Sequence, residues 1–233
     1  LQVVKDDLNG IYTLTEYDAL HRVVRETVSP DVPEFRASRN YRYTLTSLDG
    51  QQASQEVDDV KGVTTRTRLD GIGRAIYEEQ EYFTEGMQAK EFRQTSAAAY
   101  DEMGNLVRQT ALDWLADQPL TLHSHFEYDA WGEQSRETGP DGTANVSELS
   151  PFGSDGPIER SWRESAGQPT QISQLSESHY NRFGKLDRVQ RFDTQALNQR
   201  LLATPQHGDS QAVRQQVAAL LARRALPEVG ASE

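Results

Sequence analysis

The 233-residue sequence contains no cysteine, which excludes disulfide bonds and cysteine-ligated zinc sites. It has few hydrophobic residues, 36% in all, and its mean hydropathy is −0.74, which argues against an ordinary compact core. No apolar run approaches the length of a membrane-spanning helix, and the first residues lack the apolar stretch of a secretory signal peptide. The polar composition instead suits β-strands that keep one face in water.

Positive charge is also scarce. The sequence has 24 Lys and Arg residues against 36 Asp and Glu residues, which gives a net charge of −12. Because a chain of this sign repels phosphate backbones, we expect no nucleic-acid partner.

A short motif recurs along the chain, most clearly at residues 100–110 and 128–138 and in more divergent form at 17–27, 69–74 and 180–186. Each copy has a Tyr (once a Leu), then an Asp or Asn, and in four of the five copies a Gly three residues after the acid or amide. The residues that define the motif are Tyr17, Asp18, Leu69, Asp70, Gly73, Tyr100, Asp101, Gly104, Tyr128, Asp129, Gly132, Tyr180, Asn181 and Gly184. Five copies of one template indicate a repeat protein.

The residue types predict a β-hairpin for each copy. Tyr is a good strand former, and an Asp or Asn beside it opens a turn by accepting a hydrogen bond from the backbone two residues on. The Gly supplies a positive φ that other residues resist, although His21 stands at this position in the first copy. The first and last gaps between copies are nearly twice the others, which predicts one degenerate copy in each. Residues 149–153 are either such a copy or an ordinary loop.

The character of the sequence changes near its C-terminal end, so we divide the chain into a β-sheet segment, residues 1–193, and a helical or partly disordered tail, residues 194–233. Leu197, Leu201 and Leu202 are spaced as in a helix. A second helix is predicted from an N-cap at Ser210 to Ala225.

The Tyr-Asp-x-x-Gly-x-Leu pattern of residues 100–106 resembles the YD repeats of the RHS family, which includes bacterial polymorphic toxins, toxin-complex B and C components and teneurins. The resemblance covers about residues 12–193. In that family the hairpins coil side by side into a hollow β-shell around a toxic polypeptide. The Asp-Pro-x-Gly motif at which such shells cleave themselves does not occur in this sequence, so no self-cleavage centre is assigned.

The resemblance implies a mostly β fold of antiparallel hairpins, forming part of a curved or spiral YD-repeat shell with a short helical tail. It implies a non-enzymatic segment that encapsulates or presents a toxin polypeptide. The partners would be the rest of the shell, the enclosed polypeptide and other toxin-complex subunits or glycans. The protein would be secreted, or exposed on the cell surface, through a dedicated secretion system.

Two other functions are weighed against this one. The repeat aromatics could stack on sugars in a cell-surface carbohydrate-binding or adhesion module. A zinc site could also form at His123, His125 and Glu127, because alternate residues of a strand point to one side. A polar outer face opposite Leu122 and Phe126 explains the same spacing more simply, so we assign no metal, no cofactor and no catalytic residue.

Overall fold

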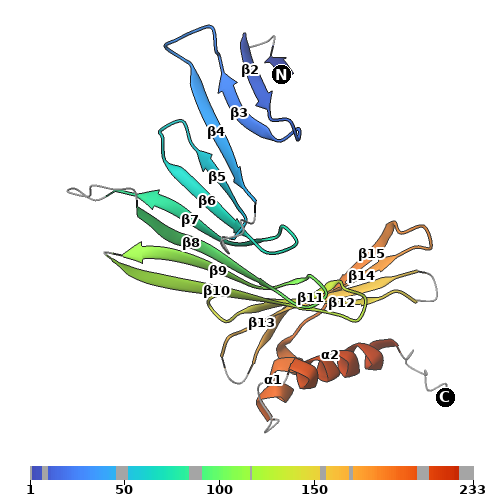
Figure 1. Ribbon diagram of the computed structural model, residues 1–233. Helices are drawn as coiled ribbons and strands as arrows, with labels where there is room; N and C mark the ends of the chain where they lie inside the picture. The colour runs from blue at the N-terminus through green and yellow to red at the C-terminus, as the bar shows by residue number, and fades with distance from the viewer. Residues whose placement is uncertain are drawn as a thin grey trace, which may run out of the picture. The chain divides into compact units, whose positions relative to one another are not determined.

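The computed structural model describes residues 2–6, 10–45, 52–83, 91–115, 117–152, 156–167, 170–203 and 210–225. These residues form fifteen strands that are hydrogen-bonded to one another in the order of the sequence, followed by two helices (Figure 1). Every strand pair whose register is described is antiparallel. The predicted fold class, mostly β and built from antiparallel hairpins with a helical tail, is confirmed.

The chain divides into two compact units, and unit 1 comprises Leu1–Asp101 and Arg108–Leu122. It contains eight whole strands and parts of β9 (Leu106–Leu115) and β10 (Gln118–Tyr128). The whole strands are β1 (Gln2–Asp6), β2 (Ile11–Tyr17), β3 (Val23–Val28), β4 (Ala37–Thr44), β5 (Ser54–Asp58), β6 (Thr64–Leu69), β7 (Ala75–Tyr82) and β8 (Glu91–Tyr100).

The described part of unit 1 has no fully buried hydrophobic side chain. Its buried side chains are instead small and polar, namely Thr15, Thr27, Ser54, Thr64 and Thr110. Thr is a good strand former, and its hydroxyl can be satisfied across strands, as where Thr27 Oγ1 lies 3.0 Å from Ser38 Oγ. Unit 1 therefore depends on strand pairing and cross-strand side-chain contacts, because it gains little from apolar burial.

Unit 2 comprises Glu102–Val107 and His123–Glu233. Beyond the remaining parts of β9 and β10, it contains five strands and both helices. These are β11 (Gln134–Thr138), β12 (Ala144–Ser150), β13 (Ile158–Glu164), β14 (Ile172–Tyr180), β15 (Leu186–Arg191), α1 (Gln195–Ala203) and α2 (Ser210–Ala225). The two predicted helices are thus present.

A hydrophobic core forms where the helices pack on the sheet of unit 2 (Figure 1). The sheet contributes Val146, Trp162, Ile172 and Leu175, and the helices contribute Leu197, Leu201, Val213, Val217 and Leu221. The apolar stripe of the C-terminal segment therefore covers one face of this unit's sheet, which is the usual way for an amphipathic helix to bury its apolar side.

Asn198 fixes helix α1 to strand β14. The backbone N–H of Ile172 donates to Asn198 Oδ1 at 2.7 Å, and Asn198 Nδ2 donates to the carbonyl oxygen of Ile172 at 2.9 Å. The amide thus satisfies both backbone groups of a residue whose side chain is only 1% exposed. No helix of the described residues is long and apolar enough to cross a membrane.

Candidate functional site

Four of the repeat copies close their hairpins with one type of five-residue turn. At Asp70 the backbone N–H donates to the carbonyl of Arg74 at 2.8 Å, and the N–H of Gly73 donates back to the carbonyl of Asp70 at 3.1 Å. The same two hydrogen bonds occur in the turns that begin at Asp18, Asp59, Asp129, Gly139 and Asn181. The Asp59 and Gly139 turns lie in the two long gaps between sequence copies. The other proposed copy, at residues 149–153, ends at Gly153, which lies outside the described residues.

An Asp or Asn side chain at the first position organises five of these six turns. Oδ1 of Asp70 accepts backbone hydrogen bonds from Ile72 at 3.0 Å and from Arg74 at 2.9 Å. The side chains of Asp18, Asp59, Asp129 and Asn181 accept the corresponding pair. The N–H of Arg74 lowers the pKa of the Asp70 carboxyl, and the N–H of Arg22 does the same at Asp18. This acceptor role explains why the motif requires Asp or Asn.

The fourth turn position needs a left-handed backbone. Gly73 has φ of +88°, and the equivalent glycines of three further copies, Gly104, Gly132 and Gly184, have values between +72° and +94°. His21 takes this position in the first copy with φ of +58°. A residue with a Cβ is strained there, so the turn at His21 forms at a cost that the glycine copies avoid.

The aromatic position of the motif coincides with a β-bulge. Tyr128 pairs with Gln134 while Glu127 pairs with Arg136, which leaves Ser135 as an extra residue. The same register shift occurs at Tyr17, Leu69 and Tyr180. A bulge bends the strand and increases its twist, so each of these four copies adds the same local distortion to the sheet.

Tyrosine hydroxyls connect each of three hairpins to the one before it. Tyr100 donates to the carbonyl of Ala75 at 3.1 Å, and Tyr128 donates to the carbonyl of Leu106 at 3.0 Å. Both acceptors are the first residue of the strand that follows a repeat turn. Tyr43, which the motif did not include, makes the same contact with Val23 at 2.9 Å. Its position in an alternating strand gave no sign of this role.

The hydroxyl of Tyr180, in the last copy, has a different partner, Oε2 of Glu159 at 2.9 Å.

An arginine completes this connection in two copies. Arg74 Nε donates to Asp70 Oδ2 at 2.7 Å, and its guanidinium lies 4.4 Å from the ring centroid of Tyr100. Arg22 likewise binds Asp18 at 2.7 Å and lies 4.6 Å from the ring of Tyr43. We call the turn acid, this arginine and the covered tyrosine the repeat cassette. It joins neighbouring hairpins by cation–π and hydrogen-bonding contacts.

Opposite charges face one another across four strands of unit 1. On β4 to β7, Arg42 pairs with Glu56 at 3.0 Å, Glu56 with Arg66 at 2.7 Å, and Arg66 with Glu79 at 3.5 Å. These residues are direct neighbours in the strand register. We call this row the charge ladder. The ladder gives Glu56 and Glu79 cationic partners on neighbouring strands.

The three candidate zinc ligands do lie on one face of β10. His123, His125 and Glu127 are all exposed, and the two imidazole centroids are 6.3 Å apart. Glu127 Oε1 lies 3.7 Å from Nε of Arg136 on the next strand. In the part of the chain that the structure describes, no group of three His, Cys, Asp or Glu residues is arranged to hold a metal ion.

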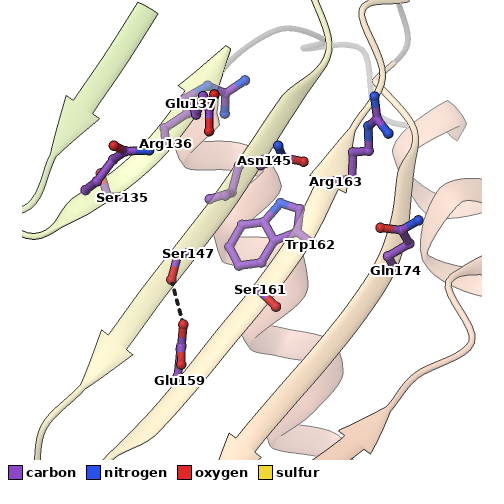
Figure 2. Close-up of a pocket in the computed structure, with 12 residues that line it drawn as sticks. Ser135, Arg136, Glu137, Asn145, Ser147, Glu159, Ser161, Trp162, Arg163 and Gln174 are labelled. Atoms are coloured by element: carbon purple, nitrogen blue, oxygen red, sulfur yellow. Dashed lines mark hydrogen bonds between the residues drawn. The ribbon is translucent and has the colours of Figure 1, made fainter. Parts of the chain in front are cut away.

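A hollow of about 240 Å³ lies on unit 2 and is bordered by strands β11 to β14 (Figure 2). Polar side chains line it, among them Glu137, Asn145, Ser161 and Arg163. Ser147 and Glu159 also line the hollow, and the hydroxyl of Ser147 donates to Oε1 of Glu159 at 3.4 Å.

Two of the lining residues, Arg136 and Trp162, contact a buried carboxylate. Glu164, which is only 3% exposed, accepts a hydrogen bond from Trp162 Nε1 at 2.9 Å and lies 2.8 Å from Arg136 NH1. A buried carboxylate needs such partners, so these groups have a structural role.

The chain matches no family model and no curated protein. Among solved structures it is similar to the crystal structure of TcdB2-TccC3, with 12% sequence identity and a TM-score of 0.42. The similarity covers 78% of this chain and 11% of that chain, so this chain spans about a tenth of the length of the structure it matches.

Proposed function

We propose that the chain is a non-enzymatic wall segment of an RHS-type YD-repeat shell. The observation that carries this proposal is the repeat cassette, in which one motif forms the turn, bends the strand and bonds to the next hairpin. At Asp70, Arg74 and Tyr100, three side chains hold the turn and its bond to the neighbouring strand. The contacts of this motif thus serve to build the sheet.

The composition of unit 1 supports the same proposal. No hydrophobic side chain is buried in the described residues of its sheet. Paired charges such as Glu56 and Arg66 line one face of the sheet. A wall that encloses a polypeptide needs faces that do not collapse onto each other or onto the cargo, and polar faces meet that need. The cargo would be a toxin polypeptide, held away from the producing cell until secretion through a dedicated system.

Containment can be tested with an unfolded probe. Reduced, carboxymethylated α-lactalbumin is digested with thermolysin in the presence of the chain, over a range of chain concentrations. A wall-forming protein should slow the digestion as it assembles. The variant Asp70→Ala with Asp129→Ala, which removes two turn acceptors, should lose this protection. Digestion at an unchanged rate at all concentrations would contradict containment.

A carbohydrate-binding module is the second candidate, and one contact favours it. Trp131 and Phe152 are 70% and 84% exposed and lie edge to face, with ring centroids 6.4 Å apart. Exposed aromatic rings of this kind can stack on sugars, whereas the repeat tyrosines have engaged hydroxyls. Glycan binding that is lost on Trp131→Ala and kept on Tyr100→Phe would support this candidate over the wall.

A further inference from the structure

Strand β15 ends the order of hydrogen-bonded strands, and only one of its two sides is paired. In the described residues it pairs with β14 alone. All six of its side chains are exposed, and helix α1 begins four residues after its end. The described residues after β15 form helices α1 and α2 and do not extend the sheet. The outer side of β15 presents backbone donors and acceptors to which another strand can bond.

Positive charge gathers at this edge of an otherwise acidic chain. Arg182 and Lys185 lie in the preceding turn, Arg188 and Arg191 lie on the strand, and Asp187 is the one carboxylate among them. Within the described residues none of the four cations has an ion-pair partner.

In the charge ladder of the same chain, strand arginines have acidic partners on the neighbouring strands. There, Arg66 faces a glutamate on each neighbouring strand. On β15, Arg188 faces His179 and Arg191 faces Ser176, which are not acidic. Arg188 NH2 lies 3.4 Å from Nε2 of His179, which in turn contacts Glu177 at 2.7 Å, so neither arginine forms a direct ion pair with an acid of β14 in the described residues.

We propose that the free side of β15 binds an acidic, extended polypeptide segment as an additional strand. Backbone hydrogen bonds along the edge hold the segment, and its carboxylates pair with Arg188 and Arg191. Because Arg191 lies three positions after Arg188 and side chains alternate along a strand, the two arginines point to opposite faces of the sheet, so the incoming strand carries acids on both faces. This inference does not rest on the containment proposed above.

The test uses the full chain and a fluorescent seven-residue peptide of Glu and Thr with acids on both faces. Fluorescence anisotropy should show binding that weakens with salt, and hydrogen exchange at the β15 amides should slow in the complex. The variant Arg188→Glu with Arg191→Glu should bind the peptide about tenfold more weakly or worse. Arg36→Glu with Arg108→Glu, which makes the same charge change at exposed sites in unit 1, should bind as the wild type does.

Two further probes separate strand addition from general attraction of anions. The same peptide with alternate amides methylated keeps its charge but cannot pair along one edge, so its binding should be lost. An anionic single-stranded oligonucleotide should bind more weakly than the peptide. Equal binding of the methylated peptide or of the oligonucleotide, or unchanged binding by the Arg188→Glu, Arg191→Glu variant, would overturn the proposal.

Discussion

The hydroxyl of Tyr100 donates a hydrogen bond to the carbonyl oxygen of Ala75, 25 residues earlier in the chain, at 3.1 Å. Ala75 is the first residue of β7, directly after the turn that Asp70 organises, and Tyr100 is the last residue of β8. The end of one hairpin strand is thus bonded to the start of its neighbour, which makes Tyr100 a link between repeats as well as a strand residue.

Removing this hydroxyl should weaken the link without disturbing the ring. We expect Tyr100→Phe to lower the free energy of unfolding by about 0.5–1 kcal/mol, the usual net value of a partly exposed hydrogen bond. Tyr77→Phe, on the neighbouring strand, is the control, because no hydrogen bond to its hydroxyl is described, and it should change little. Urea denaturation followed by circular dichroism measures both. Equal effects of the two substitutions would contradict the link.

Replacing His21 with glycine should stabilise the first repeat turn. His21 has φ of +58°, a conformation that costs a residue with a Cβ about 1–2 kcal/mol relative to its preferred backbone, whereas glycine adopts it freely. We expect His21→Gly to raise the free energy of unfolding by about 0.5–1 kcal/mol once the greater chain entropy of glycine is included.

The matched control is His123→Gly. His123 is exposed within strand β10, where glycine is unfavourable. The same chemical change should therefore destabilise the protein there. If both substitutions shift the denaturation midpoint in the same direction, backbone strain at His21 is not the cause.

Acid should loosen the repeat turns. The hydrogen bond from the backbone N–H of Arg74 lowers the pKa of Asp70. The hydrogen bond from the backbone N–H of Arg22 lowers the pKa of Asp18 in the same way. A carboxyl with a lowered folded-state pKa contributes stability above its unfolded pKa and loses it as the pH falls through the folded value. We expect stability to decline below about pH 4, the usual range of Asp.

Asp70→Asn tests this assignment, because Asn181 shows that an amide can accept the same turn hydrogen bonds. The variant should keep its fold and show a shallower loss of stability between pH 4 and pH 2. Asp187→Asn, which removes the same charge on the exposed strand β15, is the variant with which the slope of Asp70→Asn is compared. An unaltered slope in Asp70→Asn would mean that other groups govern the acid transition.

The stability lost when a leucine of helix α1 is truncated should depend on how deeply its side chain is buried in unit 2. Leu197 is 1% exposed in the core, whereas Leu202 on the same helix is 54% exposed. We expect Leu197→Ala to cost about 2–4 kcal/mol and Leu202→Ala less than about 0.5 kcal/mol. Thermal or urea unfolding, with Trp162 fluorescence as a probe of this core, measures the difference. Similar losses would show that α1 does not pack as described.

Several features could be predicted from the sequence because they depend on neighbouring residues. An Asp followed by a Gly three residues later forms a turn whatever surrounds it, so the hairpins at Asp70 and Asp129 were expected and are present. The helix from Ser210 to Ala225 was expected as well, since its apolar spacing and its cap are local signals.

Only the tertiary structure showed which distant groups meet. No local pattern distinguishes Tyr43, whose hydroxyl reaches Val23, from the neighbouring Tyr41, whose hydroxyl donates to Glu26. The charge ladder likewise depends on register, since a shift of one residue would turn Glu56 to the opposite face from Arg66. Turn chemistry is encoded within a few residues, whereas contacts between strands are decided by how the whole sheet aligns.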